Sequence, residues 1–180
     1  RAGATEVEIT NEAGIVTVRD NGRGIGDFSR LLDLGGSGWD DTFEQSEDPA
    51  GVGLFCLAPR EVSVRSRGSM ACIGGGDWTG HPVEIREDPE PIEGTLLQFQ
   101  DEEWTMAVVE RLAVFTGMRV TVDGQPCAQE RFVTEAATHC PALGCRIEVC
   151  KYENLPARHR SVRRTHGYSD NVLVNFHGQT

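Results

Sequence analysis

The chain has 180 residues, of which 38% are hydrophobic, and its 17 basic and 28 acidic side chains give a formal net charge of −11. This length and apolar content predict a folded domain with one buried core and exclude disorder as a description of the whole chain. The acidic balance argues against a broad basic face that would bind nucleic acid, although backbone amides could still hold a small anionic ligand.

The compartment is predicted from what the sequence lacks. No apolar run approaches the ~20 residues of a membrane span, and no charged-then-apolar signal stands at the start of the chain. We therefore expect a cytoplasmic protein with no membrane partner. The six cysteines are expected to be reduced thiols, because a chain of this size with its own core does not need disulfides.

The first predicted elements are two strands at residues 5–10 and 15–19, where β-branched and polar residues alternate around a turn. The second strand leads directly to Asp20. A short helix is predicted at 27–34, and an acidic, glycine-containing segment at 35–49 is predicted to be a mobile loop. The region of about 27–50 is long enough to form a lid.

The middle of the chain alternates further strands with one strong helix. Residues 51–58, GVGLFCLA, predict a helix because two glycines precede an apolar run of helical length. The remaining predicted elements are strands at 61–67, 70–73, 82–86 and 95–99, an amphipathic helix at 104–115, and a strand with a tight turn at 118–127.

After residue 127 the pattern is weaker. It predicts a short helix near 132–138, a strand at 144–150, a basic loop at 158–164 and a last strand at 171–178. Strands and helices mix without a regular βαβ alternation, so the fold class is predicted to be α+β.

Three glycine-containing motifs occur in order along the chain. Asp20 is followed by Gly22 and Gly24, then Gly51 and Gly53 precede the predicted helix, and Gly94 with Thr95 begins a predicted strand. A carboxylate at a strand end can accept the exocyclic amine of adenine. Glycines let a base or sugar lie against the backbone, and amides at a helix start can hold phosphate oxygens.

This order of motifs resembles the GHKL ATPases, a superfamily that contains gyrase B, the heat-shock chaperone of about ninety kilodaltons, MutL and the sensor histidine kinases. The resemblance covers residues 1 to about 125 and includes the opening segment AGATEVEI. It implies a Bergerat-type α/β sandwich, with a mixed, mostly antiparallel sheet and helices on one face. It also implies ATP as the ligand.

The resemblance assigns roles residue by residue. Asp20 would bind the adenine amine, partly through a water that Thr95 helps to hold, while Gly24 and Ile25 would line the base pocket and Arg23 would flank it. Gly51 and Gly53 would begin the phosphate-facing helix. The implied nucleotide-binding residues are Asp20, Gly22, Arg23, Gly24, Ile25, Gly51, Val52, Gly53, Leu54 and Thr95.

The sequence departs from the family in two places. The family's catalytic glutamate and magnesium-binding asparagine lie on a helix before AGATEVEI, and this chain begins at Arg1, so the Mg²⁺ ligand is expected upstream and no catalytic residue is assigned. We expect a fragment that does not hydrolyse ATP efficiently. The predicted lid also lacks a lysine for the terminal phosphate, and the only lysine is Lys151.

The segment at 104–126 favours one branch of the superfamily. Histidine kinases generally end soon after the strand that begins at Thr95, whereas here a helix, a strand and a further region follow. We therefore predict an ATP-binding domain at 1–127 and a partial transducer-like region at 128–180. The predicted protein is a chaperone-like or clamp-type ATPase that binds ATP and ADP, closes a lid and, at full length, forms a homodimer.

Several alternatives stay open. The chain could be a GHKL-fold interaction module without nucleotide chemistry, or a histidine kinase catalytic domain. The segment at Asp20 could be only a turn between strands. His139 and the neighbouring cysteines could bind zinc, although the spacing is unusual and a strand would point Cys145 and Cys150 to opposite faces. The basic loop at 158–164 could contact an acidic partner or solvent.

Overall fold

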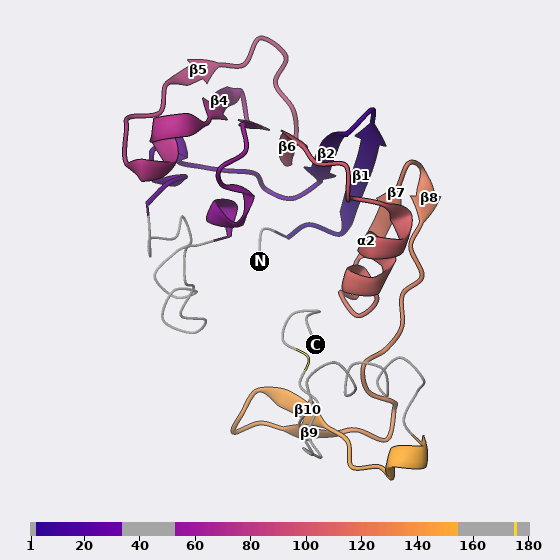
Figure 1. Ribbon diagram of the computed structural model, residues 1–180. Helices are drawn as coiled ribbons and strands as arrows, with labels where there is room; N and C mark the ends of the chain where they lie inside the picture. Colours follow the sequence, from indigo (N-terminus) through magenta and orange to yellow (C-terminus); the bar gives the residue numbers. More distant parts are fainter. Residues whose placement is uncertain (1–2, 34–52, 155–174, 176–180) are drawn as a thin grey trace. The chain divides into compact units, whose positions relative to one another are not determined.

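The computed structural model describes residues 3–33, 53–154 and 175 of the chain (Figure 1). The described chain divides into two units, Arg1–Val109 with Met118–Cys127, and Glu110–Gly117 with Ala128–Thr180. The loop predicted at 35–49, the basic loop at 158–164 and, apart from Asn175, the last predicted strand at 171–178 lie outside the described residues.

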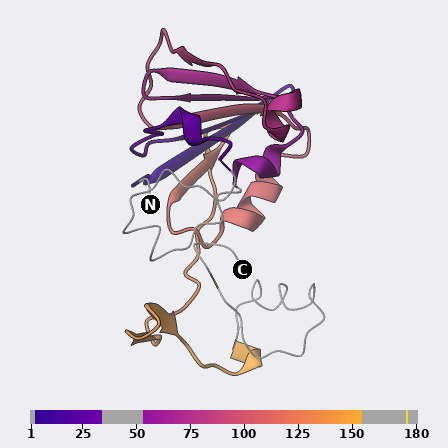
Figure 2. The ribbon, with the colours of Figure 1, turned by 90° about the vertical axis from the view of Figure 1, so that its left-hand side faces the viewer.

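The first unit is built on an eight-stranded sheet with the spatial order β5-β4-β3-β6-β2-β1-β7-β8, and Figure 2 shows its strands side by side. The strands are β1 (Glu6–Glu12), β2 (Ile15–Asp20), β3 (Val62–Ser66), β4 (Ser69–Ile73), β5 (Ile85–Glu87), β6 (Thr95–Gln100), β7 (Arg119–Val122) and β8 (Gln125–Pro126). Neighbouring strands are antiparallel except β1 and β7, which are parallel. The predicted mixed, mostly antiparallel sheet is confirmed.

Strand register separates the sheet into an apolar and a polar face. Residues directly opposite each other on neighbouring strands share a face. Val16, Phe99, Val62 and Ile73 form one such row, and all four are buried. The intervening residues on β3 and β4, such as Arg65 and Cys72, lie on the other face. The alternation that predicted the strands therefore also determines which face is buried.

Helices are sparse among the described residues. Three 3-10 segments, η1 (Phe28–Arg30), η2 (Leu54–Leu57) and η3 (Gly75–Thr79), accompany the sheet. The helix α2 (Met106–Ala113) begins in the first unit and ends in the second. It confirms the amphipathic helix predicted at 104–115, with shorter bounds. A layer of helices covering one face of the sheet, as the predicted sandwich requires, is not established by these few helices.

The helix predicted at 51–58 is wrong in type and length where it is described. Leu54–Leu57 form one 3-10 turn, and Ala58 is extended with φ −61° and ψ 144°. The following Pro59 disfavours the α conformation at Ala58, so the helix cannot continue. Gly51 and Val52 lie outside the described residues.

The strand predicted at 82–86 is also displaced. β5 spans Ile85–Glu87 only, at the edge of the sheet. Pro82 has no N–H to donate to a neighbouring strand, so strand pairing is disfavoured at the first predicted position.

The second unit contains a small hairpin, β9 (Thr138–Cys140) and β10 (Cys145–Ile147), and a 3-10 segment, η4 (Tyr152–Asn154). The hairpin is orange in Figure 1. The helix predicted near 132–138 is wrong, because the Thr134 hydroxyl accepts the Ala136 N–H at 3.1 Å and turns the chain before β9. The strand predicted at 144–150 is shortened to β10.

Within the second unit, Phe115 and Phe132 pack edge to face with ring centroids 5.4 Å apart. Among the described residues, no helix has both the length and the apolar character needed to cross a lipid bilayer.

Candidate functional site

Four polar side chains cross the apolar face of the large sheet in a single row. Asp20 at the end of β2 lies opposite Thr95 at the start of β6, Thr95 lies opposite Ser66 on β3, and Ser66 lies opposite Ser69 on β4. We call these four residues the polar row. Directly opposite residues have Cβ atoms about 4.5–5.5 Å apart, so the register brings Asp20 and Thr95 together.

The next row along the same face is entirely apolar. It consists of Val18, Leu97, Val64 and Ala71, in the same strand order. Val64 and Ala71 are buried, whereas Val18 and Leu97 are half-buried. The polar row therefore lies at one end of an apolar surface, and its Asp20 side borders apolar side chains that remain partly accessible. A flat apolar ligand with a polar edge suits such a boundary.

Asp20 presents one carboxylate oxygen to its own turn and leaves the other available. Its Oδ1 accepts the Gly22 N–H at 2.7 Å. No residue in the described part of the chain donates a hydrogen bond to Oδ2, and Asp20 is half-buried. The side chain can therefore accept a further donor from a ligand without losing the turn.

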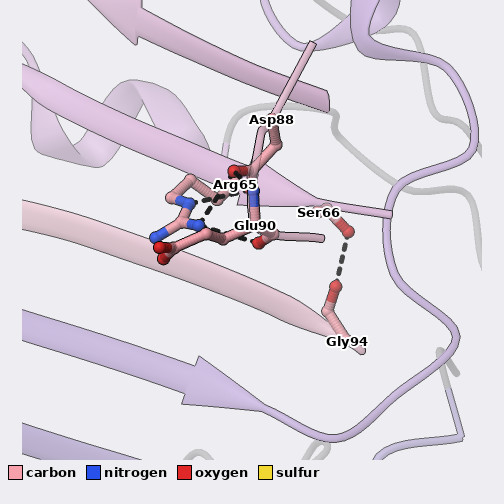
Figure 3. Close-up of polar contacts among 5 residues, drawn as sticks. All are labelled: Arg65, Ser66, Asp88, Glu90 and Gly94. Carbon is pink, nitrogen blue, oxygen red and sulfur yellow. Dashed lines mark hydrogen bonds and ion pairs between the residues drawn. The ribbon is translucent and has the colours of Figure 1, made fainter. Parts of the chain in front are cut away.

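Ser66, a member of the polar row, links three separate segments. It is fully buried, its Oγ donates to the Gly94 carbonyl at 2.5 Å, and the same Oγ accepts the Ile25 N–H at 2.9 Å. Figure 3 shows the bond to Gly94. Because one hydroxyl satisfies both groups, Ser66 holds the glycine segment after β2 and the start of β6 against the end of β3.

Contacts within the chain require glycine at Gly24 and Gly94, the two glycines nearest the polar row. Gly24 has φ +73°, and a Cβ there would lie 2.5 Å from Ser66 Oγ and 2.8 Å from the Gly94 carbonyl oxygen. Gly94 also has φ +73°, and its Cβ would overlap the Asp20 carbonyl oxygen. The close backbone approach at these positions is therefore between segments of this protein, and it needs no ligand to explain it.

A cavity of about 360 Å³ opens beside the polar row. Its lining includes Ser69 of the polar row, and the full set is Ile25, Gly26, Asp27, Phe28, Ser29, Arg67, Ser69 and Ile85. Among the sequence-predicted site residues, Ile25 alone lines it. The cavity is therefore built mainly from the segment that follows the DNGRG motif and from the β3–β4 turn.

One side of this cavity is held by a capped turn. Asp27 precedes η1 and accepts both the Ser29 hydroxyl at 2.6 Å and the Ser29 N–H at 3.0 Å. These two hydrogen bonds hold the pKa of the Asp27 carboxyl below its ordinary value. The carboxylate is thus ionised and committed to its own turn.

The remaining predicted site residues have fewer contacts with the polar row. Arg23 is exposed, Gly53 is exposed and Leu54 is half-buried. No described hydrogen bond joins any of these three to the polar row. A Cβ on Gly53 would meet nothing within 4 Å, and its φ is −55°, so neither contact nor backbone conformation requires glycine there. Gly51 and Val52 lie outside the described residues.

Sequence reasoning missed Ser66, Ser69, Arg67 and Asn21. The signal for Ser66 was present, since it stands at the inward phase of VSVRS where Val62 and Val64 are apolar. Asn21 ties the motif to β1, because its side-chain oxygen accepts the Thr5 and Glu6 N–H groups at 2.8 and 3.1 Å.

The polar face of the sheet carries a separate ion pair. Arg65 donates from Nε and a terminal nitrogen to the two carboxylate oxygens of Asp88, at 2.8 and 2.9 Å, and also to the Glu90 carbonyl at 2.8 Å (Figure 3). The Asp88 side chain is only 1% exposed. Its pKa is lowered from the ordinary value of 3.8, chiefly by the hydrogen bond from Arg65.

The described residues do not form a site for the expected Mg²⁺. No three His, Cys, Asp or Glu side chains within 3–33 and 53–154 come together in a group that could hold a metal ion. The polar row contains a single carboxylate, that of Asp20. One oxygen of this carboxylate already accepts a hydrogen bond from the Gly22 N–H. No chemical step is therefore assigned to a metal at these residues.

Comparison of the sequence with protein-family models gives no match, and comparison with curated proteins gives none. Two solved structures are similar to parts of this fold. The ATPase region of Saccharomyces cerevisiae topoisomerase II bound to ICRF-187 (dexrazoxane) is 14% identical, with 72% of this chain and 44% of that chain covered at a TM-score of 0.49.

A second structure, also of the ATPase region of Saccharomyces cerevisiae topoisomerase II, is 15% identical, with 69% of this chain and 43% of that chain covered at a TM-score of 0.49. The chain spans less than half the length of either structure. A likeness at this identity and TM-score does not by itself establish a family or an activity.

Proposed function

We propose that the chain is an adenine-nucleotide-binding domain of the GHKL type, and that Asp20 and Thr95 receive the adenine base. The observation that carries the proposal is their placement opposite each other at the end of the apolar face. The ordered motifs DNGRG, GVG and GT support it, since each stands where the resemblance implies a contact with ATP.

The chemistry of the base contact follows from the available Asp20 oxygen. A carboxylate only accepts hydrogen bonds, so it pairs with the exocyclic amine of adenine. Guanine carries a carbonyl oxygen at the corresponding position, and two acceptors repel. Thr95 can donate through its hydroxyl, directly or through water, and the half-buried Val18 and Leu97 would contact the base. The site is therefore expected to prefer ATP and ADP over GTP.

The finer parts of the proposal concern what binding does. Closure of a lid at about 27–50, transmission to residues 128–180, and a clamp-type or chaperone-like homodimer at full length follow from the resemblance. Residues 34–50 lie outside the described residues, so they contribute no contact to the argument. Arg23, Gly51, Val52, Gly53 and Leu54 remain proposed nucleotide contacts on the same basis.

The first experiment is a calorimetric titration of the chain with ATP, in magnesium and again in EDTA. We expect saturable binding, and Asp20→Asn is expected to weaken it by about 10- to 100-fold, because a hydrogen bond to a charged group contributes about 1.5–3 kcal/mol. Glu103→Gln is the matched control, since it removes one carboxylate charge from an exposed residue outside both the polar row and the proposed lid. Full affinity in Asp20→Asn would contradict the proposed base contact.

A second candidate function is an interaction module with no nucleotide chemistry. One observation favours this candidate. Contacts within the chain already explain the tight packing of Gly24 and Gly94, so these glycines do not by themselves indicate a ligand. The two candidates differ in the same titration. If neither ATP nor ADP gives a heat of binding, and circular dichroism shows that the sheet is folded, the result would favour the interaction module.

A further inference from the structure

The hairpin of the second unit places two cysteines directly opposite each other. Cys140 is the last residue of β9 and Cys145 is the first residue of β10, and the antiparallel register pairs them. Both thiols are free in this structure and half-buried. Among the other described cysteines, Cys72 lies opposite Ser63, Cys127 is buried, and Cys56 and Cys150 are exposed outside strands.

The register satisfies the distance requirement of a disulfide. Opposed residues of an antiparallel pair have Cα atoms about 4.5 Å or about 5.5 Å apart, depending on whether the two residues exchange hydrogen bonds. Disulfides join residues whose Cα atoms are about 4.4–6.8 Å apart. Opposed side chains also share a face of the hairpin, so the Cys140 and Cys145 side chains project the same way.

Hydrogen bonds at both ends of the hairpin hold this register. At the loop end, the Leu143 N–H donates to the Cys140 carbonyl at 3.2 Å. At the open end, Glu148 accepts the Thr134 N–H at 2.6 Å and the Thr134 hydroxyl at 2.9 Å. Arg146 adds a bond to the Thr134 carbonyl at 3.2 Å. A slip by one residue would break these bonds and separate the cysteines.

We propose that Cys140 and Cys145 form a reversible intramolecular disulfide. The co-reactant is a low-molecular-weight disulfide such as glutathione disulfide. One cysteine thiolate attacks it, forming a mixed disulfide and releasing one glutathione thiolate. The second cysteine thiolate then attacks the protein sulfur and releases the other glutathione. The two cysteines lose two protons and two electrons, and the glutathione disulfide is reduced to two thiols.

The second exchange step is favoured by the fold. Because the attacking thiol belongs to the same hairpin, it acts at an effective concentration of about the millimolar range or above. An exposed thiol without an opposed cysteine stops at the mixed disulfide. Oxidation is therefore expected to give an internal disulfide at Cys140 and Cys145, and a glutathione adduct at Cys150.

The link would stabilise the hairpin of the second unit. A two-stranded hairpin without further strands is marginally stable in water. A covalent bond across β9 and β10 restricts the open states of the hairpin and favours the paired one. Oxidation is expected to slow exchange of the backbone amides of 138–147, and reduction is expected to restore it.

The test uses the full chain equilibrated in glutathione buffers of increasing oxidising strength, followed by acid quenching, alkylation, denaturation and trypsin digestion. Trypsin cleaves after Arg131 and Arg146, so one peptide, 132–146, contains both cysteines and no other, while Cys150 falls in the next peptide. The expected product is a 132–146 peptide that carries no alkyl group and is two hydrogens lighter than the reduced peptide.

The controls separate the pair from general thiol reactivity. Cys145→Ser is expected to abolish the lighter peptide and leave Cys140 as a glutathione adduct, whereas Cys150→Ser is expected to leave the internal disulfide unchanged. Glutathione adducts on both Cys140 and Cys145, or equal alkylation of all three cysteines at every ratio, would overturn the proposal. A disulfide between Cys150 and either cysteine would overturn it as well.

Discussion

At the scale of single residues, the Arg65–Asp88 pair shows how a buried carboxylate is tolerated next to a sheet. Asp88 accepts two bonds from the Arg65 guanidinium and a third from the Glu90 N–H at 3.0 Å. Its own N–H donates to the Gly68 carbonyl at 2.9 Å. The pair therefore fixes the segment after β5 to β3 and to the β3–β4 turn.

The pKa of Asp88 predicts how this contact responds to acid. Because the folded-state pKa lies below the unfolded value, the contact stabilises the fold fully above the unfolded pKa, and the stabilisation is lost as pH falls through the folded pKa. We expect Asp88→Asn to lower stability at neutral pH and to show a smaller fall in the urea midpoint between about pH 5 and about pH 2 than the unchanged chain.

Asp33→Asn is the control for this prediction, since the Asp33 side chain is 55% exposed and its ion pair with Arg30 is long, at 4.0 Å. It is expected to keep both the neutral-pH midpoint and the acid dependence. Arg65→Lys keeps the charge but loses the two-pronged geometry, so it should reproduce much of the Asp88→Asn loss at neutral pH. If the urea midpoint of Asp88→Asn falls with pH as steeply as that of the unchanged chain, Asp88 is not the source of the acid dependence.

At the scale of elements, the start of β6 depends on how closely it approaches the end of β2. Gly94 precedes Thr95, and its backbone lies against the Asp20 carbonyl. Thr95 can lie opposite Asp20 only while this approach is kept. The conformation of Gly94 thus positions half of the polar row.

Gly94 and Gly124 have nearly the same φ, so comparing them separates the effect of the close approach at Gly94 from the effect of a positive φ. Gly94 has φ +73° and no room for a Cβ, whereas Gly124, in the β7–β8 turn, has φ +76° and nothing within 4 Å of a Cβ. We expect Gly124→Ala to cost about 1–2 kcal/mol of unfolding free energy from the left-handed conformation alone. Gly94→Ala is expected to cost about 1–3 kcal/mol more, because overpacking is added.

Urea unfolding followed by circular dichroism measures both variants. Equal losses in Gly94→Ala and Gly124→Ala would mean that the Asp20–Gly94 approach relaxes without cost. If Gly94→Ala does not fold at all, its soluble yield beside that of Gly124→Ala still reports the difference, since the two positions have nearly the same positive φ.

Local patterns predicted the elements unevenly. Strands whose residues alternate, such as 15–19 and 61–67, were found close to their observed bounds, β2 and β3. The helices at 51–58 and 132–138 were wrong, because Pro59 and the Thr134 turn interrupt apolar runs that look helical in composition.

At the scale of the whole molecule, the described chain consists of two units with unequal cores. The first unit contains a continuous buried face, in which Val16, Val62, Val64 and Ile73 are at most 1% exposed. The hairpin of the second unit has an exposed fraction of 46% at Ile147. We expect the first unit to hold most of the stability, because it buries most of the apolar surface described.

This difference predicts a local response to a core substitution. Ile73→Ala is expected to cost about 2–5 kcal/mol in the first unit. Hydrogen exchange should therefore speed up at the amides of β3 and β6, while the amides of β10 keep their protection. The control is Ile147→Ala, which removes a similar side chain from the hairpin and should leave β3 and β6 unchanged. Equal acceleration in β10 after Ile73→Ala would show that the two units unfold as one.

By itself the sequence determined most strands of the large sheet, the apolar face of alternating strands such as β2 and β3, and that Asp20 and Thr95 stand at strand ends. These properties are local, because the alternation of side chains has a period of two along a single strand. The tertiary structure alone decided that β3 lies next to β6, so that Ser66 enters the polar row, that Gly24 and Gly94 approach their own chain, and that Cys140 lies opposite Cys145. Strand neighbours and register depend on hydrogen bonds and packing summed over segments far apart in the chain, and no local pattern records that sum.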